Sequence, residues 1–268
     1  MNLGMIDYSF PLEELEYYLL ILTRVSFFIF SAPFFGQNGS VPRRVRVLMS
    51  VFISYLLYEV LSPHVYISYS TLLDYATYVI KEALCGVLLG AACQFCMMIV
   101  SFAGQMVDME IGLSMVSLMD PSTRQNITIT GAMYSYVFML LFLVTGMYQY
   151  LLKVLSETFI LVPIGEVQFN MSVLYDGLVT FLTRYVLLGF QVMIPVFCTI
   201  LLVNCILGVM AKVSPQMNMF SVGIQIKVLA GLGVLYITCT MLPKAADFIF
   251  NEMKLMMVTM VKAFGGSA

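Results

Sequence analysis

The chain has 268 residues, of which 61% are hydrophobic and 10% charged, and its mean hydropathy is +0.95. A soluble protein of this length could not bury so much apolar surface, so the composition favours a helical membrane protein. Thirteen basic and fifteen acidic side chains leave a net charge of −2, which gives nucleic-acid binding almost no electrostatic support.

Six apolar runs follow one another along the chain, each close to the roughly 20 residues with which a helix crosses a bilayer. They cover residues 17–35, 45–61, 78–103, 129–152, 178–209 and 218–243. The last segment, 244–264, mixes charged and apolar positions and predicts an amphipathic helix that lies against a neighbour or an interface. Since no long linker divides the chain, we expect one all-α, polytopic domain over residues 1–268.

The beginning of the chain predicts its orientation in a membrane. The first residues are acidic and lack the basic segment of a cleaved signal peptide, so the first helix should remain in the mature protein. Arg43, Arg44 and Arg46 form a basic cluster after the first apolar run, and the positive-inside rule places that loop in the cytoplasm.

Four basic residues, Arg24, Arg184, Lys212 and Lys227, fall within or at the edges of apolar runs. A charge there is costly unless it is paired or solvated, which predicts an aqueous interior or a polar contact between subunits. The six cysteines also lie in apolar runs, so we expect buried free thiols instead of disulfides.

The connection at residues 104–127 is moderately apolar and long, and such a connection usually packs into something. It contains several methionines, among them Met115 and Met119, whose deformable side chains can close around a variable surface. Asp108 and Glu110, two positions apart, point to different faces of a helix, so we expect solvated or lumen-facing carboxylates and no catalytic pair.

Motifs of enzymes do not occur in this sequence. It has no phosphate-binding glycine loop, and His64 is its one histidine, so we expect no enzyme, no metal and no cofactor. Gly86 and Gly90 form a small-residue face on which another helix could approach closely.

Four stretches of the sequence resemble the FliR family of flagellar export proteins, whose counterpart in injectisomes is called the T component. They are Arg24 with SFFIFSAPFFGQNGSVPRRVRVLMS (26–50), KEALCGVLLGAACQFCMMIVSFAGQMVDMEIGLSMVSLMDPSTRQN (81–126), SETFILVPIG (156–165) and NCILGVMAKVSPQMNMFSVGIQIKVLAG (204–231). They span nearly the whole chain in the family's order. One departure is Gly146-Met147-Tyr148, where many members have a histidine after the glycine.

The resemblance implies a structural fusion of P-like and Q-like subunits built from long helical hairpins. It also implies a single-copy subunit of the type III export gate, in the inner membrane at the flagellar basal body. The implied partners are five FliP-type and four FliQ-type subunits, an FlhB-type switch protein and unfolded flagellar substrates.

The resemblance assigns three groups of residues. Those of the channel plug are Gly112, Ser114, Met115, Met119, Asp120, Pro121, Arg124 and Asn126. Those of the lower hairpin near the substrate entrance are Lys212, Pro215, Gln216 and Asn218. Those of subunit packing are Arg24, Pro33, Gly36, Pro42, Arg43, Gly86, Gly90 and Gly208. Asp120 and Pro121 are expected to end the plug and cap the next helix.

Other functions remain open at this point. A self-contained transporter or channel would also have six spans, although the two halves show no clear internal repeat. An intramembrane enzyme would need converging catalytic side chains that the sequence does not offer. The sequence does not decide between a flagellum and an injectisome, or whether the helices stay in the bilayer after assembly.

Overall fold

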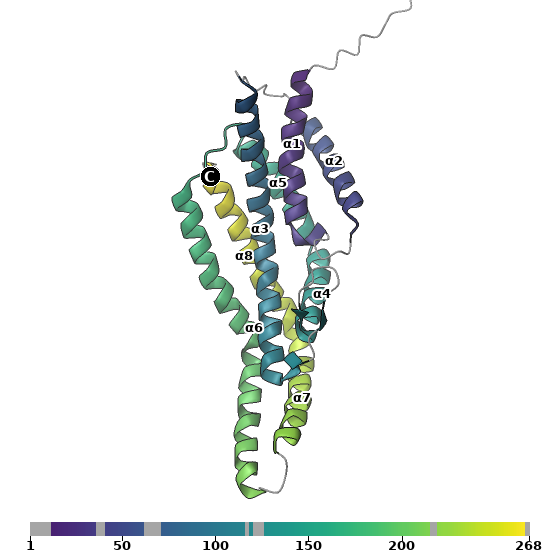
Figure 1. Ribbon diagram of the computed structural model, residues 1–268, viewed down its shortest axis with the longest axis vertical. Helices are drawn as coiled ribbons and strands as arrows, with labels where there is room; N and C mark the ends of the chain where they lie inside the picture. Colours follow the sequence, from purple (N-terminus) through teal and green to yellow (C-terminus); the bar gives the residue numbers. More distant parts are fainter. Residues whose placement is uncertain are drawn as a thin grey trace, which may run out of the picture. The chain divides into compact units, whose positions relative to one another are not determined.

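The computed structural model describes residues 12–35, 41–61, 71–115, 118–119, 126–214 and 219–265 (Figure 1). Its helices are α1 (Leu12–Ser31), η1 (Pro33–Phe35), α2 (Arg43–Val60), α3 (Leu72–Ile111), η2 (Leu113–Met115), α4 (Ile129–Val144), α5 (Met147–Leu161), α6 (Met171–Val213), α7 (Met219–Thr238), η3 (Cys239–Met241) and α8 (Leu242–Ala263). Two short strands, β1 (Leu118–Met119) and β2 (Asn126–Ile127), pair in antiparallel fashion. Apart from this pairing, the predicted helical fold is confirmed for the described residues.

Helices α3 and α6 are far longer than ordinary membrane spans. They have 40 and 43 residues, which corresponds to roughly 60 Å at 1.5 Å per residue. The hydrocarbon core of a bilayer is only about 30 Å thick. Either helix therefore extends well beyond the region that lipid tails can cover.

Fewer helices qualify as membrane spans than the six predicted. Among the described residues, Leu72–Ile111, Met171–Val213 and Val222–Ala263 are long and apolar enough, and the bent pair α4 and α5 is a fourth if it counts as one span. Helices α1 and α2 each carry four charged residues, which leaves too short an apolar stretch.

The boundaries of two predicted elements were wrong for physical reasons. The run at 129–152 is broken between α4 and α5, where Gly146 adopts φ 72°, a left-handed conformation that favours glycine. The predicted boundary between the sixth run and the amphipathic segment is only the 3-10 turn η3, so one apolar helical run continues from Val222 to Ala263.

The described residues divide into two compact units. The first comprises residues 1–91, 152–171 and 260–268, and it contains α1, α2 and the first half of α3. Its core includes Leu20, Ile21, Val25 and Phe28 of α1, all nearly inaccessible to solvent. Helix α2 lies along α1 (Figure 1) and turns Ser50 and Ser54 inward, which allows the close helix contact typical of small residues.

The second unit comprises residues 92–151 and 172–259, and it contains the second half of α3, α4, α7 and most of α6 and α8. Aromatic side chains connect its helices: Phe95 of α3 stacks on Phe181 of α6, with ring centroids 5.6 Å apart. Phe250 of α8 contacts Phe138 and Phe142 of α4. These contacts dominate core energetics because aromatic rings bury large apolar areas.

Helix α8 is amphipathic, as predicted for its segment. Ile249, Phe250 and Met253 lie on its buried side, whereas Lys244 and Asp247 are exposed. The chain itself therefore covers part of the apolar surface of this helix, whereas Phe248, Leu255 and Val258 remain exposed.

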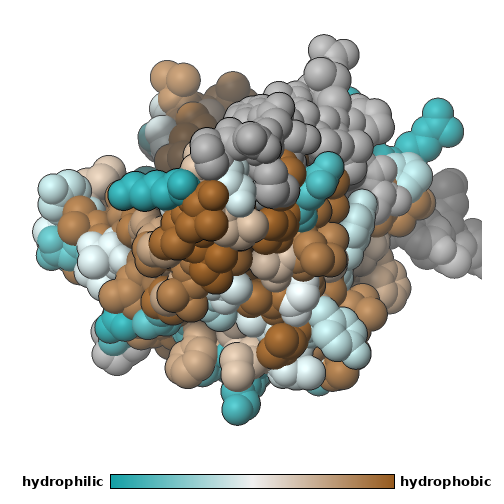
Figure 2. Space-filling model, turned by 90° about the horizontal axis from the view of Figure 1, so that it is seen from below, coloured by the Kyte–Doolittle hydropathy of each residue, from teal (hydrophilic) through white to brown (hydrophobic). Residues whose placement is uncertain are grey.

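Much apolar surface remains uncovered elsewhere. Large exposed hydrophobic side chains follow α6 along its whole length, from Met171 to Val213, and they include Leu182, Leu202 and Ile206. Figure 2 shows hydrophobic residues in brown over a large part of the surface seen from below. A surface of this kind indicates lipid or protein contact.

The six cysteines are free thiols, as predicted, but only half of them are buried. Cys85, Cys93 and Cys96 of α3 are buried, whereas Cys198, Cys205 and Cys239 are exposed. The expectation of burial was wrong for these three because the apolar helices that carry them lie at the surface of the chain.

Candidate functional site

Between α3 and α4, the described residues include a turn at Gly112 and the antiparallel strands β1 and β2. Gly112 adopts φ 92°, a backbone conformation that favours glycine, and its N–H donates to the carbonyl of Asp108 at 3.0 Å. Further on, Leu118 pairs with Ile127 and Met119 with Asn126. We call residues 112–126 the plug segment, after the role that the resemblance implies.

The predicted plug residues are only partly described. Ser114 is exposed in η2, Met115 ends that turn, and Met119 and Asn126 lie opposite each other in β1 and β2. Asp120, Pro121 and Arg124 lie outside the described residues.

A buried carboxylate closes the base of the plug segment. Asp108 of α3 accepts a hydrogen bond from the backbone N–H of Thr130 at 2.8 Å and a second one from the Thr130 hydroxyl. Asp108 is 0% exposed and Thr130 2%. Because Thr130 lies in the first turn of α4, the carboxylate satisfies a helix N-terminal N–H and also suits the positive end of the helix dipole. We call these two residues the clasp.

Two glycines bring the backbones of α3 and α4 together beside the clasp. A Cβ atom on Gly104 would collide with the Cα of Gly131 and would lie 2.7 Å from its backbone nitrogen. Gly104 precedes Asp108 by one helical turn, so both residues lie on the same face of α3. The end of α3 and the start of α4, which flank the plug segment and which we call its stems, thus meet in direct backbone contact.

The clasp corrects one expectation from the sequence and leaves a second one untested. Asp108 is not solvated or lumen-facing, because its carboxylate is buried against the chain's own α4. Asp120, which was expected to cap α4, lies outside the described residues, so this expectation stays a prediction. Among the described residues, Asp108 of the preceding helix accepts the N–H of Thr130, and Thr128 at the N-cap position makes no side-chain capping bond. The spacing of 22 residues between the partners left no local signal for this contact.

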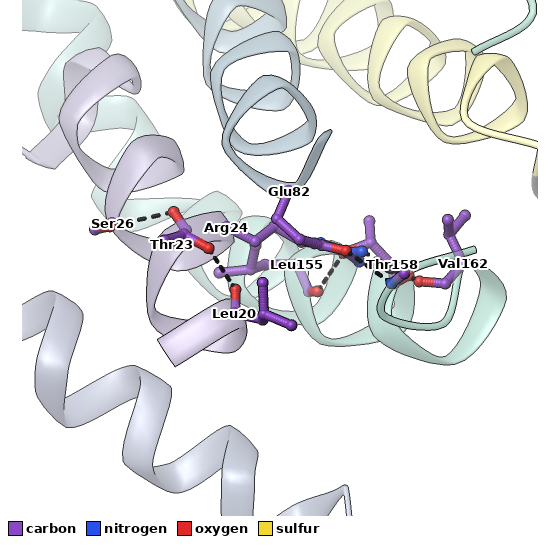
Figure 3. Close-up of polar contacts among 9 residues, drawn as sticks. Leu20, Thr23, Arg24, Ser26, Glu82, Leu155, Thr158 and Val162 are labelled. Carbon is purple, nitrogen blue, oxygen red and sulfur yellow. Dashed lines mark hydrogen bonds and ion pairs between the residues drawn. The ribbon is translucent and has the colours of Figure 1, made fainter. Parts of the chain in front are cut away.

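A second buried polar cluster ties three segments of the first unit together (Figure 3). The Arg24 Nε of α1 donates to the Glu82 carboxylate of α3 at 2.5 Å, and both side chains are almost fully buried. The guanidinium also donates to the carbonyls of Thr158, at 3.1 Å, and Val162, at 3.2 Å. The other Glu82 oxygen accepts the backbone N–H of Gly165 at 3.3 Å.

This Arg24–Glu82 cluster connects α1, α3 and the end of α5, which lie in three of the stretches that resemble the family. Its guanidinium caps the C-terminal carbonyls of α5 and lies 4.3 Å from the ring centre of Phe159. The expectation that Arg24 faces an aqueous interior or another subunit was therefore wrong, since its charge is paired inside the chain.

The other basic residues of the apolar runs have different surroundings. Arg184 lies 3.8 Å from Glu252, with the side chains 55% and 19% exposed. Lys212 is exposed at the end of α6, and Lys227 is partly buried in α7 with no acidic partner among the described residues. Pro215, Gln216 and Asn218 lie outside the described residues, so the predicted entrance hairpin has no described geometry beyond Lys212.

The residues expected in subunit packing differ in their surroundings. Gly86 and Gly90 lie against α1 of the same chain, because a Cβ on Gly86 would collide with the Arg24 carbonyl and one on Gly90 would lie 2.5 Å from the Ser31 Cβ. Gly208 has open space around it, and Pro42 and Arg43 are exposed. Pro33 is half-buried in η1, and Gly36 lies outside the described residues.

Metal chemistry has no candidate site in the part of the chain that the structure describes, since no three His, Cys, Asp or Glu side chains gather there.

Comparison with known proteins places this arrangement in a family. Residues 15–253 match the family model described as bacterial export proteins, family 1. Flagellar biosynthetic protein FliR of Buchnera aphidicola subsp. Baizongia pistaciae is 26% identical over 86% of this chain and 88% of its own length. FliR of Escherichia coli is 24% identical over 90% of this chain and 91% of its own length.

A relative with a different name has the same level of identity. Surface presentation of antigens protein SpaR of Shigella flexneri is 26% identical over 92% of this chain and 96% of its own length. The chain therefore belongs to the FliR/SpaR family of bacterial export proteins, which are non-enzymatic membrane components of the flagellar and type III export apparatus.

Proposed function

We propose that the chain is the single-copy R-type subunit of a flagellar type III export gate. In this proposal it joins five FliP-type and four FliQ-type subunits, resembles a fusion of one subunit of each kind, and closes their helical assembly. The gate lies at the basal body, beside an FlhB-type switch protein, and conducts unfolded flagellar substrates. Membership of the export family supports this function.

The apolar surface of α6 is the observation that carries the proposal. Exposed hydrophobic side chains extend from Met171 to Val213, a helix length of roughly 60 Å. Even a tilt of about 40°, the upper end of the range for membrane helices, would leave this surface longer than the bilayer core of about 30 Å. Because lipid cannot cover all of it, other polypeptides are needed.

The plug segment is proposed to close the protein-conducting channel of the gate. Its described residues support this role: the segment begins at a left-handed glycine, its strands pair, and Asp108 and Thr130 join the two helices that flank it. The methionines at 115 and 119 suit this role because unbranched side chains adapt to a variable surface. The assigned residues are Gly112, Ser114, Met115, Met119, Asp120, Pro121, Arg124 and Asn126.

The end of α6 is proposed to face the substrate entrance. Lys212 is exposed there, shortly before Pro215, Gln216 and Asn218 in the sequence. Gly208, with free space on its helix face, and the exposed Pro42 and Arg43 are proposed to contact other subunits.

The T component of a virulence-type injectisome is a second candidate. The similarity to SpaR, over nearly the full length of both chains, favours it. The two candidates differ in partners and not in fold, so complementation of deletion strains separates them: the flagellar role predicts restored motility, and the injectisome role predicts restored secretion by that system only.

The test of the gate proposal is assembly. Co-expression with FliP-type and FliQ-type subunits should give one complex whose native mass matches five, four and one copies. Leu202→Asp, a change on the exposed apolar face of α6, should abolish that complex, whereas Asn251→Asp, which adds the same carboxylate at an exposed polar position of α8, should not. A chain that is stable alone and transports a small solute would contradict the proposal.

A further inference from the structure

The Asp108 carboxylate is an unusual group for the interior of this protein. It is fully buried, and it accepts hydrogen bonds from the N–H and the hydroxyl of Thr130, both of which are neutral groups. No basic side chain pairs with it among the described residues. Burying a carboxylate without a cation is unfavourable, and a neutral side chain could have filled the same space at lower cost.

The position of the clasp in the chain suggests what it does. It joins the last turn of α3 to the first turn of α4 and so closes a loop formed by residues 109–129. The backbone contact of Gly104 with Gly131 lies beside it on one side. One turn further along α3, the Ile111 side chain fills the space left by Gly231 of α7. A Cβ atom added to Gly231 would lie 2.6 Å from the Cδ1 atom of Ile111.

We propose that Asp108 and Thr130 are positioning residues that hold the plug segment in its resting place. The inference rests on the proposed plug function and adds the part of the chain that sets the plug's position. The clasp keeps the two stems of the hairpin together, so the plug segment stays in the channel until an arriving substrate displaces it. When the clasp is weakened, the stems separate more often and the closed gate leaks.

The hydrogen bond from the Thr130 hydroxyl can be removed with little change in shape. Thr130→Val keeps the volume and the backbone N–H but removes the hydroxyl donor to Asp108. We expect the passive ion flux through the assembled gate to rise about tenfold, because loss of a buried hydrogen bond to a charged group shifts a two-state equilibrium by about that factor. The flux is measured with an ion-sensitive dye in vesicles that contain the purified complex.

Two variants serve as controls for the chemistry and for the substitution. Thr130→Ser retains the hydroxyl and should leave the flux within about twofold of the natural gate. Thr158→Val makes the same change at an equally buried threonine whose hydroxyl donates to Leu155 of its own helix, and it should not leak. The amount of assembled complex, determined before reconstitution, normalises each flux.

A second variant tests the acceptor independently. Asp108→Asn keeps the volume of the side chain but removes its charge, and it should also raise the flux. Combined with Thr130→Val it should leak little more than either single variant, because the two changes remove one shared interaction. Additive increases would contradict a common clasp.

Deletion of residues 113–126 separates the failure of this inference from the failure of the plug assignment. If the deletion leaks and both clasp variants remain as tight as the natural gate, the clasp proposal is wrong and the plug assignment stands. If the deletion itself does not leak, the plug assignment is wrong, and the clasp inference is wrong with it.

Discussion

The Arg24–Glu82 cluster and the Asp108–Thr130 clasp solve the same problem in different ways. Each places a charged side chain of one helix at the end of another, with Arg24 at the C-terminal carbonyls of α5 and Asp108 at the N-terminus of α4. Both charges suit the dipole of the helix end that they contact. In the first cluster, however, the charge is neutralised by a second charge, whereas in the clasp no countercharge lies among the described residues.

The difference indicates distinct uses. Arg24 and Glu82 together satisfy three backbone groups and join α1, α3 and the end of α5, which is the arrangement expected of a permanent structural core. The clasp consists of one pair of residues, which flank the connection between α3 and α4. In the proposed gate, a contact of that size would fix the resting position of the plug segment and still be opened by a substrate.

The largest effect is expected from breaking the Arg24–Glu82 cluster. Arg24→Met should destabilise the first unit by about 3–5 kcal/mol, because it leaves the Glu82 carboxylate buried without its partner. The amount of protease-resistant subunit in membranes, compared across temperatures, measures this loss. Adding Glu82→Leu should recover a large part of it, since no unpaired charge then remains.

The matched control is the partly exposed ion pair of the second unit. Arg184→Gln removes its contact with Glu252, and the loss should be within about 1 kcal/mol because solvent screens exposed pairs. If both arginine variants had equal effects, the central structural role of the buried cluster would be refuted.

A smaller effect is expected at the glycine contact beside the clasp. Gly104→Ala places a methyl group against the backbone of Gly131, which cannot yield as a flexible side chain would, so we expect a loss of about 1–3 kcal/mol. Gly208→Ala has free space and should be neutral or slightly stabilising within the chain. The same protease assay compares them.

The pair of glycine variants also examines subunit packing. If Gly208 faces another subunit, Gly208→Ala should reduce co-purification with the partner subunits while the chain itself remains stable. Unchanged assembly would remove Gly208 from the proposed packing surface.

The sequence predicts the helical character of the chain better than its pairing. Apolar runs locate the long helices α3 and α6 because the length of an apolar segment can be read directly from the sequence. The left-handed turn at Gly146 interrupts such a run without changing its hydropathy, so the break between α4 and α5 was not visible. The charges of α1 and α2 were visible, but their effect on span length was underestimated.

The polar contacts could not be predicted because they depend on tertiary structure. Arg24 and Glu82 are 58 positions apart, and Asp108 and Thr130 are 22 apart, so no local spacing connects them. The sequence indicated only that a charge in an apolar run needs a partner or water. The sequence did not show that the partner of Arg24 lies inside the chain and is not water in a channel; the structure shows this.

The central claim is that other polypeptides cover the exposed apolar helices, and the chain's own cysteines test it directly. Cys198 and Cys205 of α6 are exposed, whereas Cys85, Cys93 and Cys96 are buried and serve as unreactive references. In detergent, a thiol reagent should label the two α6 cysteines of the isolated chain but not those of the assembled gate, as resolved by mass spectrometry of peptides. Equal labelling in both states would contradict the account.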